Sequence, residues 1–349
     1  MLTLILSTAA LLVAAPADAP AAAQSQRTQH PRDWDGRLDF TLAPTGRAAE
    51  PSERIHLSLR YGGGEGDRRS HYGRTMDLAD LPGVTASDLA SSDAPVRFQI
   101  VREAGTIDCA GTSRGEGRAA GTCRFAPDQA FVADLDRRGI GRPGLEDQFH
   151  LAKAGVGRSL LDELARQGYP RPRVSDLVAL GIHGADADYL RGLDAAGYRV
   201  GSLDRLVAFR IHGVSPAYIG EIAALGGAFR NMAADDLVAM RIHGVTSAFA
   251  REMAALGYAG LRPGDLVAMR IHGVRPDRVR ELAALGYRNL TAEQLTAFAI
   301  HGVTPAYVRE MAAAGYPNLT VEQLLNLRIH GVRADDARAL NAAVGGEAR

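Results

Sequence analysis

The sequence predicts an α+β protein in which a small antiparallel β domain is followed by an all-α solenoid of about seven helix-hairpin repeats. Two observations predict this fold. The tripeptide Ile-His-Gly occurs six times between residues 182 and 331, at intervals of 29 or 31 residues, and such a period is typical of stacked repeats. Before the repeats, apolar and polar residues alternate with period two, which is typical of strands that bury one face.

The N-terminal residues 1–23 are predicted to be a signal peptide. Residues 2–15 form an uncharged apolar run that is short for a membrane span, and the small residues at 21–23 are typical of a cleavage site. No Lys or Arg precedes Arg27, so a positive n-region is missing, and an Ala/Pro-rich leader or a misplaced start codon is the alternative. We expect export, a flexible linker over residues 24–36 and no integral membrane segment in the mature chain.

Residues 37–126 are predicted to form the β domain. Three runs alternate apolar and polar side chains, at residues 38–42, 55–61 and 96–100, and each is expected to be a half-buried strand. Glycine-rich or proline-containing segments separate the runs and are expected to be turns or loops.

The two cysteines are predicted to form a disulfide in this domain. They flank the turn Gly115-Glu116-Gly117, and a hairpin folded about Glu116 places Cys109 opposite Cys123. Opposed strand residues have Cβ atoms ~4.5–5.5 Å apart, close to the Cβ separation of a disulfide, and exported chains commonly form such bonds. Two buried thiols are the alternative, because a register shift of one residue would prevent the bridge.

Residues 127–343 are predicted to form the solenoid, with a disordered tail over residues 344–349. In a typical unit, Thr291 and Gln294 form a capping box that begins the first helix. Gly302 then ends that helix in the left-handed conformation, and Pro305 occupies the first position of the second helix. One leucine column is expected to face the neighbouring repeats, namely Leu177, Leu206, Leu237, Leu266, Leu295 and Leu324.

The repeated histidines and glycines are predicted to be structural. A histidine ring at the end of the first helix can serve a carbonyl that has no partner in the helix. Metal binding is a second interpretation, disfavoured because a solenoid points equivalent side chains the same way whereas metal ligands must converge. A pH-sensing ladder of buried rings is the third. The residues are His183, His212, His243, His272, His301 and His330, with Gly184, Gly213, Gly244, Gly273, Gly302 and Gly331.

The sequence contains no catalytic or phosphate-binding motif, and we predict a non-enzymatic protein without cofactor or metal. Basic and acidic residues number 40 each, so charge gives no reason to expect nucleic acid or an anionic membrane. The expected partner is a protein. Candidate partner contacts are aromatic side chains at the third position of the second helix, with packing between helices as the alternative: Tyr189, Tyr218, Phe249 and Tyr307.

The segment 295–310, with the sequence LTAFAIHGVTPAYVRE, resembles helical repeats in the C-terminal extracytoplasmic tails of bacterial antirepressor-sensor metallopeptidases of the BlaR/MecR type. The segment 96–106, VRFQIVREAGT, is similar to the part that precedes those repeats. The resemblance covers residues ~50–345, excludes the peptidase domain and carries over no catalytic role. It implies an interaction or scaffold module of the bacterial cell envelope, periplasmic or secreted. The alternative is a metal-binding or pH-responsive sensor that uses the histidines.

Overall fold

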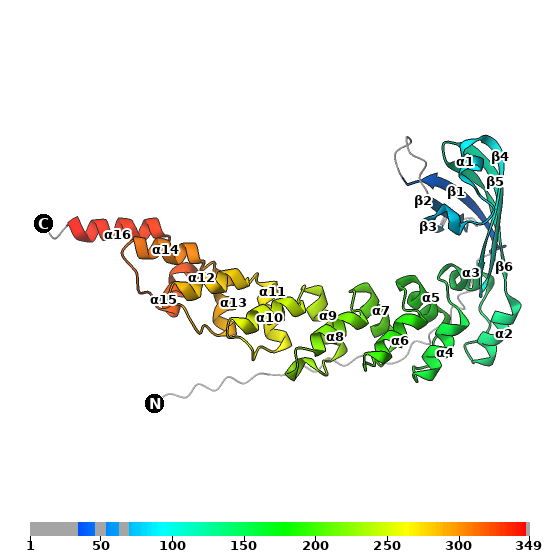
Figure 1. Cartoon of the computed structure of the whole chain (residues 1–349). Coiled ribbons are helices and arrows are strands. Elements are labelled where there is room, and N and C mark those ends of the chain that lie inside the picture. Colours follow the sequence, from blue (N-terminus) through cyan, green and yellow to red (C-terminus); the bar gives the residue numbers. More distant parts are fainter. Residues whose placement is uncertain (1–33, 46–53, 63–69, 347–349) are drawn as a thin grey trace, which may run out of the picture.

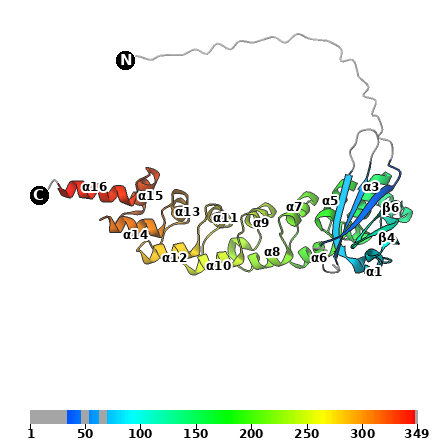
Figure 2. The same cartoon turned by 90° about the horizontal axis from the view of Figure 1, so that it is seen from above.

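The computed structural model describes residues 34–45, 54–62 and 70–346. The predicted signal peptide and most of the predicted linker lie outside these residues. An antiparallel sheet occupies one end of the molecule, and the helices extend from it as an elongated array in two layers (Figures 1 and 2). The predicted fold class, a small antiparallel β domain followed by a helical part, is therefore confirmed.

The sheet contains six antiparallel strands in the described residues, in the order β3-β2-β1-β6-β5-β4. The three predicted runs lie in β1, β2 and β4, and their apolar side chains point into a buried core. Strand β3 has few apolar residues and no clear alternation, so the sequence did not reveal it. The strands are β1 (Arg37–Pro44), β2 (Arg54–Tyr61), β3 (Ser70–Asp77), β4 (Ser92–Arg102), β5 (Gly105–Gly115) and β6 (Arg118–Pro127).

Two short helices, the 3-10 helix η1 (Leu78–Asp80) and the helix α1 (Ala86–Ala90), connect β3 to β4. The β5–β6 hairpin places Cys109 directly opposite Cys123, and the two residues are joined by a disulfide. The predicted disulfide is confirmed. Its two cysteines belong to the buried core of the sheet, so the bond ties together strands at the centre of the domain.

Trp34 corrects the predicted linker. Its ring centroid lies 5.8 Å from that of Tyr61, 6.4 Å from that of Phe125 and 5.0 Å from that of Phe149. Residues 34–36 therefore belong to the folded β domain and are not part of a flexible linker. A single tryptophan in a polar segment has no periodicity, so its burial was not predictable from the pattern. Because Phe149 comes from the first array helix that contacts the sheet, sheet and array share one core.

The helices alternate between two layers, and most helices pack on the helix two places along the chain. The layer of first helices contains α3 (Leu145–Lys153), α5 (Val174–His183), α7 (Leu203–Ile211), α9 (Ala234–Ile242), α11 (Pro263–Ile271), α13 (Ala292–His301) and α15 (Val321–Ile329). The layer of second helices contains α2 (Gln129–Arg137), α4 (Arg158–Arg166), α6 (Ala187–Ala195), α8 (Pro216–Ala223), α10 (Ser247–Ala255), α12 (Pro276–Ala284), α14 (Pro305–Ala313) and α16 (Ala334–Gly346).

The helix ends follow the predicted rules. The six repeated glycines have φ between 67° and 75°, and in each case the N–H of the next residue bonds the carbonyl five residues back at 2.8–2.9 Å, as in a Schellman motif. The capping box of Thr291 and Gln294 is present. The predicted leucine column is buried. The 3-10 helix η2 (Gly227–Phe229) accommodates the two extra residues of the single 31-residue interval.

The C-terminal boundary differs from the prediction. Helix α16 continues to Gly346, so residues 344–346 are helical and do not belong to a disordered tail. The helix packs on α14, and such packing overrides local propensity. No helix in the described part of the chain is long and apolar enough to cross a membrane.

Candidate functional site

One exposed isoleucine per repeat forms a row along the layer of first helices. These side chains are 52–60% exposed, whereas few other large apolar side chains of the described residues are as open to solvent. Five of the six adjacent histidines are exposed as well. We call this set the isoleucine row: Ile182, Ile211, Ile242, Ile271, Ile300 and Ile329.

Helical periodicity explains why these isoleucines point outwards. In α11, Leu266 and Met269 lie three residues apart, face the core and are almost fully buried. Ile271 follows Met269 by two residues, which is a rotation of about 200° around the helix axis. The half-buried Val267 and Ala268 precede Ile271 by four and three residues and lie on the same side. Helix α11 therefore presents a small apolar surface, not an isolated methyl group.

The length of the row indicates the kind of ligand that it fits. Packed helices are separated by ~8–10 Å, so six equivalent positions extend over a distance on the order of 40–50 Å. A small molecule cannot contact such a surface as a whole. Contiguous exposed apolar surface is typical of protein-interaction sites.

Among the described residues, only one of the repeated histidine rings is hydrogen-bonded to a carbonyl at the end of its own helix. Nδ1 of His330 lies 2.8 Å from the carbonyl oxygen of Asn326. Elsewhere an arginine of the next repeat takes this role: its Nε donates to the carbonyl of His183, Gly213, His243 or His301 at 2.8–3.5 Å. The predicted ring contact thus holds for the last repeat alone. Because five of the six histidines are exposed, they do not form the row of buried rings that the third interpretation assumes.

The same arginines stack on the aromatic side chains of the preceding repeat. The guanidinium carbon lies 4.7–5.2 Å from the ring centroid at each of four steps, a cation–π distance. The repeated arginines could be found in the sequence, because four of the six Ile-His-Gly triplets follow an arginine. The sequence did not show that each arginine stacks on an aromatic ring of the preceding repeat. We call these pairs the aromatic–arginine ladder: Tyr189 with Arg210, Tyr218 with Arg241, Phe249 with Arg270 and Tyr307 with Arg328.

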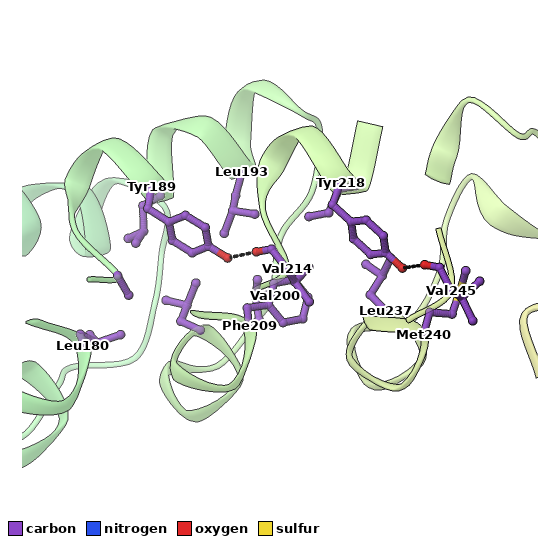
Figure 3. Close-up of a cluster of buried hydrophobic side chains, with 14 of the residues drawn as sticks. Leu180, Tyr189, Leu193, Val200, Phe209, Val214, Tyr218, Leu237, Met240 and Val245 are labelled. Atoms are coloured by element: carbon purple, nitrogen blue, oxygen red, sulfur yellow. Dashed lines mark hydrogen bonds between the residues drawn. The ribbon is translucent and has the colours of Figure 1, made fainter. Parts of the chain in front are cut away.

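The ladder rings are buried, and this decides between the two interpretations of the aromatics. They are 5–7% exposed, so they pack between repeats and are not available as partner contacts. Tyr189 and Tyr218 donate their hydroxyl hydrogens to the carbonyls of Val214 and Val245 at 2.6 and 2.8 Å (Figure 3). Tyr307 makes the equivalent bond at 3.1 Å. Burial raises the pKa of Tyr218 to about 12, and raises the pKa of the Tyr189 and Tyr307 phenols as well.

A polar cluster joins the sheet to the array. Lys153 donates from Nζ to the hydroxyl of Tyr61 at 2.9 Å and lies over the rings of Tyr61, Tyr72 and Phe149 at 5.1–5.7 Å. Nε2 of His150 lies 3.3 Å from the same hydroxyl. Burial, with a contribution from Lys153, lowers the pKa of His150. The cluster fixes the sheet on α3, because two polar groups of that helix meet one tyrosine of β2.

Metal ligands do not converge in the part of the chain that the structure describes. No group of three or more His, Cys, Asp or Glu side chains there is arranged to hold a metal ion. The repeated histidines follow one another along the array, as expected of equivalent positions in a solenoid.

These features define the class of protein: a helical-repeat protein with an N-terminal β domain and an extended apolar row on one layer. No protein-family model, curated protein or solved structure matches the chain.

Proposed function

We propose that the chain is an exported, non-enzymatic interaction module of the cell envelope, which docks a partner protein along the isoleucine row. The observation that carries the proposal is the exposure of one isoleucine in each of six repeats, at 52–60%. At this exposure each isoleucine forgoes about half of the ~1.5–3 kcal/mol that complete burial of its side chain would contribute. A partner that covers the row recovers this free energy, so the row is more readily explained by binding than by folding.

The disulfide supports the exported location, since such bonds persist in oxidising compartments. The role also agrees with what the resemblance to the sensor tails implies. A metal-binding or pH-responsive sensor has less support, because the histidines do not converge with other ligands in the described residues and most of their rings are exposed.

Site-specific photo-crosslinking in the envelope tests the proposal. A photo-reactive residue at position 211 or 242, in the row, is expected to give the same discrete crosslinked product. The same residue at position 217 or 248, exposed in the second layer, is expected to give none. The double variant Ile211→Glu/Ile242→Glu should lose the complex, because charge on an apolar contact must be desolvated, and the matched control Ala217→Glu/Ala248→Glu should keep it.

Circular dichroism and the thermal midpoint should be unchanged in both double variants, since all four positions are exposed. Products that form equally from both layers, or a complex that survives glutamates in the row, would overturn the proposal. A product that contains two copies of this chain would replace the proposed partner with self-association.

A further inference from the structure

Two of the six steps aligned on the Ile-His-Gly triplets lack the aromatic–arginine pair: the first, with Leu160 and Gly181 in the two positions, and one inside the ladder. When the repeats are aligned on their Ile-His-Gly triplets, Arg278 stands in the position of Tyr218 and Tyr307. Ala299 stands in the position of the stacking arginine, immediately before Ile300. The repeat that lacks the ring therefore also lacks, one repeat further on, the guanidinium that would cover it.

This double replacement leaves a pocket between two consecutive repeats. Its volume is about 390 Å³, including the part that opens to solvent. At the four ladder steps the corresponding space is filled by a buried ring of the chain itself. The walls are apolar side chains of α12 and α13 and of the turns beside them: Val274, Val279, Leu282, Leu295, Phe298 and Val303.

Two polar groups at the pocket have no partner in the described part of the chain. The carbonyl of Val303 is equivalent to those of Val214 and Val245, which accept phenol hydroxyls, but no described donor reaches it. Arg278 is one of the lining residues of the pocket and is exposed, and its guanidinium has no acidic partner among the described residues. Arg275, also at the pocket, is bound to Asp277 at 2.6 Å.

We propose that this pocket binds a tyrosine side chain of the partner that has a carboxylate beside it. The ring takes the place of the missing ladder ring, its hydroxyl donates to the Val303 carbonyl, and the carboxylate pairs with Arg278. Three of the four ladder steps show that the space accepts a phenol, and the free guanidinium supplies the charge complementarity. The inference rests on the proposed function, because the occupant belongs to the protein that docks on the isoleucine row.

The pocket would also give the row a register. Six equivalent isoleucines let a partner slide by one repeat with little change in contact. A pocket between the repeats that contain Ile271 and Ile300 makes this alignment different from a shift by one repeat. Specificity requires such a difference between competing arrangements.

The pocket can be tested with N-acetyl-tyrosine, which combines the phenol ring with a carboxylate. In methyl-detected NMR of the full exported chain, titration is expected to give saturable shifts at Val279, Leu282 and Val303. N-acetyl-tyrosinamide, which lacks the carboxylate, should bind about tenfold more weakly, because a charge-assisted contact is lost. N-acetyl-alanine, which lacks the ring, should give no saturable shift.

Two variants locate the binding. Arg278→Tyr/Ala299→Arg restores the pair found at the four ladder steps, so it should fold and should abolish binding of N-acetyl-tyrosine. Arg278→Ala should bind N-acetyl-tyrosine and its amide with equal affinity. Shifts that spread over all repeats, do not saturate or persist in the filled variant would overturn the pocket proposal.

The two proposals fail separately. Ile211→Glu/Ile242→Glu lies outside the pocket and should retain N-acetyl-tyrosine binding even where it loses the partner. If the filled variant binds the partner with unchanged affinity and an unchanged pattern of crosslinks from the row, the pocket proposal falls and the docking proposal stands. If the pocket binds the probe but the row gives no specific crosslink, the docking proposal falls.

Discussion

The sheet and the helical array both bury leucines, but they differ in how far apart in the sequence their contacting residues lie. In the sheet, neighbours in space come from distant parts of the sequence: Leu38 of β1 is paired with Cys123 of β6. In the array, α5 packs on α7 and α6 packs on α8, so contacts reach mainly the next repeat. A sheet of this kind is held by long-range pairing and cross-linking, whereas an array is a sum of interfaces between neighbours. A destabilising substitution should therefore affect the whole sheet when it lies in the sheet, but only neighbouring repeats when it lies in the array.

The same difference explains why a candidate site can be recognised in the array and not in the sheet. Because the array repeats one interface, a single departure from the pattern stands out, as at Arg278 and Ala299. The sheet has no such internal reference. Its exposed face carries mainly polar residues, together with the exposed Val101, and it has no repeated unit against which any one of them can be compared.

The largest predicted effect comes from a matched pair of core substitutions. Leu57 in β2 and Leu206 in α7 are both 0% exposed, and replacement of either by alanine should lower the free energy of unfolding by ~2–5 kcal/mol. By hydrogen exchange, Leu57→Ala should reduce protection across the six strands. Leu206→Ala should reduce it mainly from α5 to α9. As a control, Asp204→Ala, exposed in the same helix, should change stability by less than about 0.5 kcal/mol.

An equal spread of exchange in the two leucine variants would contradict the comparison. It would mean that sheet and array unfold as one unit through the shared core at Phe149 and Trp34.

Reduction of the disulfide should have the next largest effect. Cys109 and Cys123 are 14 residues apart, and closing a loop of this size stabilises a fold by ~3 kcal/mol in the chain-entropy description. In urea unfolding with and without reductant, the sheet transition should shift to lower urea while the helical transition stays in place. The variant Cys109→Ala/Cys123→Ala should be insensitive to reductant. A shift of the helical transition by the same amount would show that the array depends on the sheet.

The smallest predicted effect concerns the ladder. Tyr218→Phe removes one hydroxyl bond to Val245 and should cost ~1 kcal/mol at neutral pH. Because burial raises the pKa of Tyr218 to about 12, above the ~10 of an unfolded tyrosine, the neutral phenol favours the folded state. This stability is present below pH ~10 and is lost as the pH rises from ~10 towards 12.

Urea unfolding across this alkaline range provides the measurement. The parent should lose more stability than Tyr218→Phe between neutral pH and pH ~12. A loss of the same size in both proteins would show that this phenol does not titrate with unfolding.

Much of the fold follows from the sequence because its signals are local. Thr291 and Gln294 cap a helix within one turn, and Gly302 ends that helix directly after its last residue. The disulfide was also predictable, since a short hairpin relates its two cysteines by simple counting. These features depend on chain geometry over a few residues, and repetition of the unit adds the number and order of the helices.

Only the tertiary structure decided which surfaces are buried and which are open. Tyr218 is covered by Arg241 of the next repeat, and Trp34 is covered by Phe149 of α3. Both contacts join elements whose relative placement depends on how layers stack, and local propensity carries no information about this. The pocket at Arg278 has the same origin, because a missing side chain leaves space only where a neighbouring repeat forms the opposite wall.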